Sequence, residues 1–408
     1  MASKGRIAIF SIDAKLGREV KGATRYVYLA ELLQQSGYEV DFITSRFQHW
    51  EKRQRDLDAF DYSAHSFKIK FIEEPSYPKN MCPQRIWAHH VMAGRVAEYF
   101  ECDHAYDLIY SQIPPNDITL AIGRVAKKYN IPFVIDVNDL WPEAFRIALD
   151  VPVLSDIAFS PFYRQAKAAY DLADAIVGTS DEYASRGFKD RAQDIPKVVV
   201  YVGNDVDAFD AGVAANAGEV HKADDEVWVA YAGTLSACYD LGTLIRAVAL
   251  LQVDYPHVKL KLLGDGVVRG ELEAVAKQAG CDVEFLGYVP HDVMAAYLAA
   301  SDILVNSLVG NAPQSIPTKI GDYLAAGKAM LNTSLSPEFS SKVVADGFGV
   351  NVQPESVDEL RDALQALVAD EESRAAMGEA ARAVAEEQFD RKRSYQAIVS
   401  LIDNLVQR

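Results

Sequence analysis

The residues with the clearest chemical potential lie in one short segment, residues 315–327, which reads SIPTKIGDYLAAG. A loop containing Pro317 leads into a predicted short helix that opens with Lys319 and carries Asp322 in its first turn. A carboxylate at Asp322 can accept hydrogen bonds from both hydroxyls of a ribose, while Lys319 and the helix dipole favour a pyrophosphate. The pattern is equally typical of a capped helix whose Asp offsets the dipole, so this segment alone leaves both readings open.

Three further loops each follow a predicted strand in the same half of the chain, at residues 233–239, 264–266 and 287–290. Parallel strands end at the same edge of a sheet, and ligands of open α/β sheets bind at that edge. We therefore expect these loops and residues 315–327 to converge on one ligand. The candidate ligand-binding residues in the three loops are Gly233, Thr234, Gly264, Asp265, Tyr288 and Val289.

A fourth glycine-containing loop, GREVKGATR, places Gly17 and Gly22 between the first predicted strand and its helix. Backbone N–H groups at such a helix start can hold an anion, although a plain tight turn would use the same glycines. The loop lacks the G-x-G-x-x-G pattern of dinucleotide-binding domains, and Ala23 stands where a P-loop needs lysine. These departures argue against a dehydrogenase and an ATPase.

Alternating strands and helices must position these loops. Strand-length apolar runs alternate with helix-period patterns along both halves of the chain. The runs are residues 7–12, 40–44, 108–111, 133–137, 175–179 and 198–202 in the first half, and 227–232, 258–263, 283–286, 303–306 and 329–332 in the second. This alternation predicts an α/β fold with two doubly wound, Rossmann-like domains.

The domain boundaries follow from length and local composition. A chain of 408 residues suits two domains of about 200 residues. Residues 207–226 are rich in Ala, Gly and Asp without a strand signal, and are predicted as a linker between domains 1–206 and 227–390. Residues 391–408 form an amphipathic helix, which we expect to return to the first domain, although a dimer contact would also bury its apolar stripe.

The net charge of -17 argues against a nucleic acid partner, because phosphate backbones repel acidic surfaces. The acidity is uneven: residues 1–205 carry 25 Lys and Arg against 28 Asp and Glu, and residues 206–408 carry 16 against 30.

No segment approaches twenty apolar residues, which predicts a cytoplasmic protein. The four cysteines and eight histidines show no metal-ligand spacing, so we expect structural or surface roles for them.

Several longer runs resemble the retaining glycosyltransferases of family four, which have the two-Rossmann GT-B fold. In the second half these runs are AGTLSACYDLGTLI, KLLGDG, VEFLGYVP, SDILVNS and SIPTKIGDYLAAGKAML. In the first half they are YSQIPPNDITLAIGRVAKKYNIPFVIDVNDLWPE, ADAIVGTSDEYASRGF and YVGNDVDAF. The likeness covers nearly the whole chain in order, and is nearest to the bacterial branch that builds surface polysaccharides such as capsule and O-antigen lipopolysaccharide.

The resemblance implies that the second domain binds the nucleotide-sugar donor. The family's pair of glutamates, seven residues apart, falls on Gln314 and Asp322, where the first would contact the donor sugar and the second the ribose. Gln314 is neutral, which puts the identity of the sugar in doubt. The family's usual Arg and Lys are replaced by Thr234 and Tyr239, so Lys319 becomes the candidate for the main pyrophosphate cation. The other donor-binding candidates are Gly22, Arg269, Ser315, Ile316, Pro317 and Thr318.

The resemblance also assigns Asp139, Trp141, Pro142 and Glu143 to the stretch that in the family faces the donor sugar from the acceptor domain across a cleft. Asp139 and Glu143, together with Lys319, are the implied catalytic residues. A capped helix start with a packed Trp is the alternative for this stretch. The implied reaction retains the anomeric configuration without a metal, with a UDP- or GDP-linked sugar as substrate and no other cofactor.

Residues 45–100 are long for a Rossmann connection and mix aromatic with basic side chains. They could contact anionic headgroups or a polyprenyl-diphosphate-linked glycan acceptor at the inner face of the cell membrane, or form an ordinary excursion of helix and strand.

Two rival functions remain open. One is a nucleotide-sugar epimerase of the same fold, and the other is a catalytically silent subunit that binds a sugar nucleotide, which Gln314, Thr234 and Tyr239 would suit.

Overall fold

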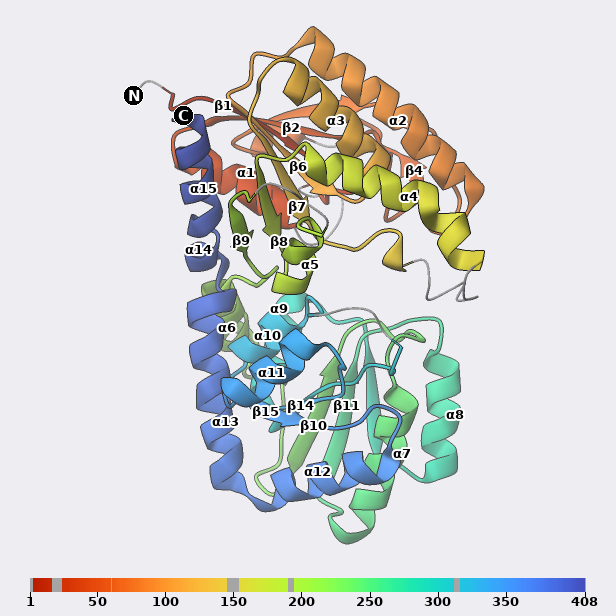
Figure 1. Ribbon diagram of the computed structural model, residues 1–408. Coiled ribbons are helices and arrows are strands. Elements are labelled where there is room, and N and C mark those ends of the chain that lie inside the picture. The colour runs from red at the N-terminus through yellow and green to blue at the C-terminus, as the bar shows by residue number, and fades with distance from the viewer. Residues whose placement is uncertain are drawn as a thin grey trace. The chain divides into compact units, whose positions relative to one another are not determined.

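The computed structural model describes residues 3–16, 24–59, 61–144, 154–189, 194–311 and 316–407 (Figure 1). The chain divides into two compact units. The first comprises residues 1–200 and 395–408, and the second comprises residues 201–394. The predicted α/β fold of two doubly wound domains is confirmed, because each unit is built around its own parallel sheet.

The sheet of the first unit has seven strands in the order β5-β2-β1-β6-β7-β8-β9, and every neighbouring pair is parallel. The strands are β1 (Arg6–Phe10), β2 (Glu39–Ser45), β5 (Lys68–Ile72), β6 (Leu108–Ile113), β7 (Phe133–Val137), β8 (Ala175–Gly178) and β9 (Lys197–Val199). The central strands β6, β7 and β8 are buried along their whole length, as parallel strands covered on both faces are. A short hairpin follows β2, with strands β3 (Phe47–Gln48) and β4 (Arg53–Gln54).

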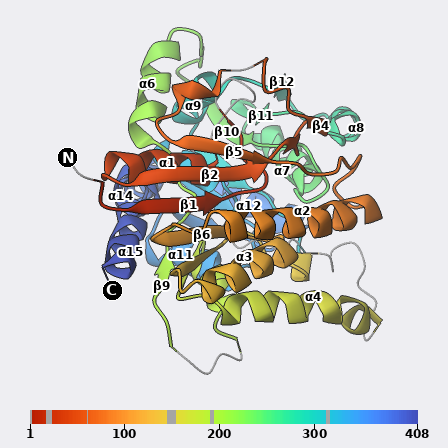
Figure 2. The ribbon, with the colours of Figure 1, turned by 90° about the horizontal axis from the view of Figure 1, so that it is seen from above.

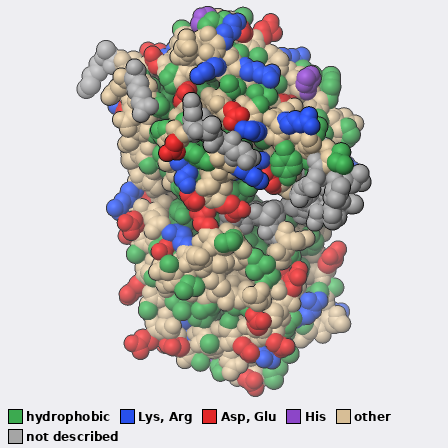
Figure 3. Space-filling model, in the orientation of Figure 1, with side chains coloured by type: hydrophobic (Ala, Val, Ile, Leu, Met, Phe, Trp, Pro, Cys, Tyr) green, Lys and Arg blue, Asp and Glu red, His purple; other side chains and the backbone are tan. Residues whose placement is uncertain are grey.

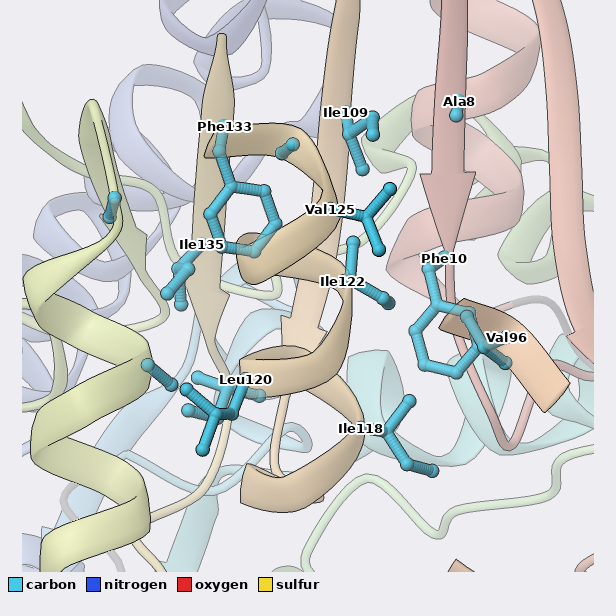
Figure 4. Close-up of a cluster of buried hydrophobic side chains, with 14 of the residues drawn as sticks. Ala8, Phe10, Val96, Ile109, Ile118, Leu120, Ile122, Val125, Phe133 and Ile135 are labelled. Carbon is cyan, nitrogen blue, oxygen red and sulfur yellow. The ribbon is translucent and has the colours of Figure 1, made fainter. Parts of the chain in front are cut away.

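Three helices lie side by side on one face of this sheet: α2 (Pro83–Cys102), α3 (Asn116–Lys128) and α4 (Leu154–Asp171) (Figures 1 and 2). Figure 4 shows the core beneath them, where Ile118, Ile122 and Val125 of α3 meet Phe10 and Phe133 of the strands. The opposite face is covered by α1 (Arg25–Gln35) and by the C-terminal helix α15 (Gln396–Val406). The first unit also contains a 3-10 turn at Tyr62–Ala64 and helix α5 (Asp181–Arg186).

The C-terminal helix packs on the first unit as predicted. Ile398, Ile402 and Leu405 of α15 are buried in the same cluster as residues of β1 and α1. Tyr38 donates a hydrogen bond of 2.6 Å to Asp403, which also pairs with Lys4. The apolar stripe of this helix is therefore part of the first unit's own core.

The sheet of the second unit has six parallel strands in the order β12-β11-β10-β13-β14-β15. The strands are β10 (Val227–Ala232), β11 (Val258–Leu263), β12 (Val283–Gly287), β13 (Ile303–Asn306), β14 (Ala329–Asn332) and β15 (Gly349–Asn351). One face packs on α7 (Leu241–Asp254), α8 (Arg269–Ala279) and α12 (Val357–Ala369). The other packs on α6 (Val206–Asn216), α9 (His291–Ala300), α10 (Ile320–Ala325), α11 (Pro337–Ala345) and α13 (Glu371–Val384). A π-helical turn (Ala385–Phe389) and α14 (Arg391–Ser394) complete this unit.

The prediction that residues 207–226 form a linker between the domains is wrong for the first half of this range. Residues Val206–Asn216 form helix α6, which packs against α9, and Asp205 caps it by accepting a hydrogen bond of 3.0 Å from the Ala208 N–H. The division between the units lies earlier, between Val200 and Tyr201. The Ala- and Gly-rich composition concealed this helix because small residues gave no clear helical periodicity, and Phe209 supplies most of its buried apolar surface.

Candidate functional site

The predicted loops of the second unit meet at the carboxyl ends of β10, β11 and β12. Backbone hydrogen bonds join them directly: Gly233 donates to Leu263 at 2.9 Å, Gly264 donates to Gly287 at 2.7 Å, and Leu235 donates to Asp265 at 3.0 Å. A pocket of about 270 Å³ lies at this junction. It is lined by Gly233, Thr234, Leu263, Gly264, Asp265, Tyr288, Val289 and Met294. The structure thus brings together all six residues that we predicted from these three loops.

Two glycines make this close junction possible. Gly264 has φ +129°, and a Cβ placed on it would lie 1.9 Å from the carbonyl oxygen of Gly233. A Cβ on Gly266 would lie 2.1 Å from the carbonyl oxygen of Leu235. Only glycine permits both the backbone conformation and the close approach of the loops. The glycines therefore bring the backbones of the three loops together, and the side chains of Leu263, Tyr288, Val289 and Met294 line the rest of the pocket between them.

Lys319 lies beside the 233–239 loop without a counter-ion. Its ammonium is 4.0 Å from the ring centroid of Tyr231 and 3.9 Å from that of Tyr239, and it is buried without a hydrogen-bond partner among the described residues. Burial lowers its pKa well below the ordinary value. Cation–π contacts offset only part of the cost of removing an ammonium from water. An anion bound at this position would supply the missing partner.

Asp322 lies on α10 and is held by two side chains that our sequence analysis did not select. Its Oδ1 accepts hydrogen bonds from Asn204 Nδ2 at 3.2 Å and from His291 Nε2 at 3.0 Å. The hydrogen bond to Asp322 raises the pKa of His291. We expected structural or surface roles for all histidines, and the signal that we missed is that His291 directly follows the 287–290 loop.

Other predicted donor-side residues have ordinary partners. Arg269 pairs with Glu273 at 2.8 Å and lies 3.7 Å from Asp265, so two acids already surround it. Pro317 is buried, and its carbonyl accepts a hydrogen bond of 3.0 Å from Ile320. Ile316 is half-buried and Thr318 is exposed in the same loop. Gly22, Gln314 and Ser315 lie outside the described residues.

Asp139 and Glu143, the candidate catalytic acids of the first unit, both make local contacts. Asp139 Oδ1 accepts a hydrogen bond of 2.8 Å from the Leu140 N–H, and its Oδ2 accepts one of 3.1 Å from the Trp141 ring. Glu143 pairs with Arg186 at 2.6 Å. Burial raises the pKa of Asp139. These contacts stabilise the turn after β7, and the assignment of both acids to catalysis stays a prediction.

The same sheet edge of the first unit holds further buried titratable side chains that were not predicted. Glu74 is 2% exposed, and burial raises its pKa to about 7. His89 lies 4.0 Å from it, stacks on Trp141, and has its pKa lowered by burial to about 3. Glu74 follows β5, the edge strand missing from the prediction, so its position could not be inferred.

Comparison with known proteins decides the family of the second unit. Residues 215–384 match the family model described as glycosyl transferases group 1. This part of the chain is a glycosyl transferases group 1 domain. The domain includes all the described loops that form the 270 Å³ pocket, together with Lys319 and Asp322. None of the curated proteins matches the chain in sequence.

Solved structures show that the whole chain has the fold of GT-B glycosyltransferases. Sucrose-phosphate synthase from Thermosynechococcus elongatus superposes with a TM-score of 0.73 at 19% identity, over 99% of this chain and 100% of that one. HepE from Anabaena, crystallised with UDP, gives 0.71 at 17% identity over 98% and 100%. A trehalose-6-phosphate protein from E. coli bound with UDP-2-fluoro glucose gives 0.67 at 10% identity over 98% and 99%. The predictions of the GT-B fold and of a glycosyltransferase are confirmed.

Within the described ranges, no group of three or more His, Cys, Asp and Glu side chains is placed to hold a metal ion. No helix in that part of the chain is long and apolar enough to cross a membrane.

Proposed function

We propose that the protein transfers a sugar from a UDP- or GDP-linked donor to a glycan or lipid-linked glycan acceptor, with retention of configuration and without a metal. The observation that carries the proposal is the pocket between the glycine loops at the carboxyl edge of the second sheet, beside Lys319, whose buried ammonium has no hydrogen-bond partner among the described residues. Two proteins of similar fold, HepE and the E. coli trehalose-6-phosphate protein, have structures with UDP or a UDP-sugar bound, which favours UDP. We further infer a role in cell-surface polysaccharide synthesis, from the sequence resemblance and the structural likeness to WaaG, a glycosyltransferase of lipopolysaccharide biosynthesis.

In this mechanism the second unit stabilises the departing diphosphate. Lys319, together with those N–H groups of the 233–239 and 264–266 loops that make no bond within the protein, offers fixed positive potential to the phosphate oxygens, which carry more charge in the transition state than in the donor. Asp322 accepts from the ribose hydroxyls and fixes the position of the nucleotide. The departing oxygen takes the proton of the acceptor hydroxyl. No side chain therefore has to act as a general base beside the reacting carbon.

The proposal is tested by thermal stabilisation with UDP-, GDP- and other sugar nucleotides, because a ligand that binds only the native state raises the unfolding temperature. The stabilising donor is then incubated with acceptor pools while nucleoside diphosphate release is measured. Release that depends on acceptor supports transfer. Conversion of the donor alone to another sugar nucleotide would identify an epimerase instead, and tight donor binding without release from any pool would identify a silent subunit.

Metal independence is a separate prediction. Activity should be unchanged in excess EDTA, because Lys319 and the loop N–H groups supply the positive potential that a metal provides elsewhere. The measurement is the initial rate of nucleoside diphosphate release before and after chelation. Loss of activity that a divalent ion restores would contradict it.

A further inference from the structure

Four of the six large exposed apolar side chains described in the first unit lie around the starts of two helices, and Trp50 and Leu57 lie elsewhere. Trp87 and Ile86 on α2 are 59% and 55% exposed, Met81 just before α2 is 63% exposed, and Ile157 on α4 is 68% exposed. In the second unit the large exposed apolar residues are aliphatic or tyrosine side chains, of which only Leu250 and Val253 share a helix. Several large exposed apolar side chains gathered at one end of two helices indicate a binding surface, whereas scattered residues do not.

A groove runs between these helices. A cavity of about 450 Å³ lies between the starts of α2 and α3 and the middle of α4, and a second, shallower one of about 400 Å³ continues along α4. Pro161 lines both cavities, so they lie next to each other. The other apolar or aromatic walls of the first cavity are Pro83, Ile86, Trp87, Trp141 and Phe162.

The polar groups of the groove offer little to a sugar. Asn116 already donates to the carbonyl of Trp141 at 3.0 Å, and Asp117 already accepts from the Ile118 N–H at 3.0 Å. His89 stacks on Trp141 at the groove floor, and burial lowers its pKa to about 3, so the ring is uncharged at neutral pH. His90 and Gln165 also line the first cavity, and Ser160 and Arg164 line the second beside Ile157 and Pro161. Apolar and aromatic side chains still form most of the wall of the first cavity, which fits a hydrocarbon chain better than a ring of hydroxyls.

Two cations that form no ion pair with a described residue lie beside the groove, and one of them, Arg85, acts to lower the pKa of the nearby carboxyls of Glu74, Asp13 and Asp139. Lys52 donates a hydrogen bond of 2.6 Å to the side-chain oxygen of Asn80. Arg85 donates one of 2.9 Å to the backbone carbonyl of Asn80, so both cations lie close to this residue. The Arg85 guanidinium lies 4.8 Å from the ring centroid of Trp141, which lines the groove. Neither cation, nor the neighbouring Lys79, forms an ion pair with a described residue. By contrast, Arg46, Lys128 and Lys197 of the same unit each pair with an acid.

The charge on the surface agrees with this local excess. On the face drawn in Figure 3, Lys and Arg side chains are numerous over the first unit, whereas Asp and Glu outnumber them over the second. An apolar groove with these two cations beside it is complementary to an amphiphile with an anionic head.

We propose that the groove between α2 and α4 binds the hydrocarbon chain of a lipid phosphate or diphosphate acceptor, whose phosphate lies at Lys52 and Arg85. This inference rests on the proposed function, because it names the class of acceptor. It replaces the broader expectation for residues 45–100, in which Phe47, Arg55, Phe67 and Tyr77 prove to be buried and unavailable to a lipid. The groove is formed by α2, α3 and α4, and α4 lies outside that range.

The test uses alkyl phosphates of eight to twelve carbons below their micelle concentrations, titrated into the full-length protein by calorimetry. Each additional buried methylene should strengthen binding about fourfold until the groove is full. Trp87→Ala should weaken decyl phosphate binding about tenfold, and Val267→Ala, at a 92% exposed site in the second unit, should not change it. Arg85→Gln should remove the preference for decyl phosphate over decanol, whereas Arg124→Gln, at an exposed site on α3 that lines neither cavity, should keep it.

Two results would overturn the inference: equal affinities for all chain lengths, or equal decyl phosphate binding by the parent protein and Trp87→Ala. Binding to phosphatidylglycerol vesicles without any binding of soluble decyl phosphate would also overturn it, in favour of a membrane-surface contact. UDP binding is measured in the same samples. If UDP still binds while the chain-length series fails, only the acceptor class is wrong, and loss of both would reject the proposed function.

Discussion

The two units share one sheet topology, but backbone loops line the carboxyl edge of one sheet and large side chains line that edge of the other. In the second unit the edge is made of glycine loops bonded backbone to backbone around a single buried cation. In the first unit the corresponding edge carries large side chains, namely Trp141, Glu74, His89 and Arg85. Backbone groups suit a ligand portion that is always the same, such as a diphosphate, and side chains can be exchanged one by one to suit a changing acceptor. The comparison therefore predicts where substitutions act on binding of the nucleotide and where they act on the acceptor.

The largest effect should come from breaking the backbone wall. Gly264→Ala places a Cβ against the Gly233 carbonyl at a strained φ, and should destabilise the protein by at least about 2 kcal/mol and abolish UDP binding. Gly280→Ala is the matched control, since Gly280 also has a positive φ but nothing lies near its Cβ position. It should cost only about 1 to 2 kcal/mol and leave binding intact. Urea unfolding and UDP titration measure both, and equal behaviour of the two variants would refute a steric role for Gly264.

The next effect concerns the buried cation. Lys319→Met should weaken nucleoside diphosphate binding by roughly 1.5 to 3 kcal/mol, because a charge-assisted contact is lost. The stability of the unliganded protein should be retained or should rise, because the ammonium is buried without a partner. Binding and stability thus move in opposite directions. A variant that loses both equally would mean that Lys319 serves only the fold.

A smaller loss is expected at the ribose. Asp322→Asn keeps the size of the side chain and removes its charge, so UDP and the UDP-sugar should both bind more weakly by about 1 to 2 kcal/mol. Gln314→Ala should weaken only the sugar-bearing ligand. Titrations of both ligands against both variants decide the placement of the donor. Unchanged affinity in Asp322→Asn, or equal losses for both ligands in Gln314→Ala, would show that the placement is wrong.

The smallest effect is a pH dependence at His291. Asp322 raises the pKa of His291 above its ordinary value of 6.5, so the ion pair contributes its full stability below pH 6.5 and loses it as the pH rises through the raised pKa. His291→Ala should therefore cost a few tenths of a kcal/mol near pH 6 and nothing near pH 9. Unfolding midpoints at both pH values test this. A cost that grows with pH would contradict the assigned direction.

The sequence predicted central strands well and edge strands poorly, for a physical reason. Strands such as β7 and β10 are buried on both faces, and their sequences are mainly apolar runs. β5 (KIKFI) is a half-exposed edge strand that alternates with lysine, and β15 has only three residues, so neither produced a clear pattern. The glycine loops were predictable because they follow strands directly. The surroundings of Lys319 and Asp322 were not, because Tyr231 and Asn204 reach them from distant parts of the chain.

The pairing of α15 with the first unit also sets an order for folding during synthesis. Residues 1–200 are made before the second unit, but the apolar face that α15 covers, which includes Tyr26 and Leu29 of α1, stays open until residues 396–406 have been made. The second unit is continuous in sequence and can close its core earlier. The first unit is thus begun before the second and completed after it. Deletion of residues 396–406 should therefore destabilise the first unit more than the second.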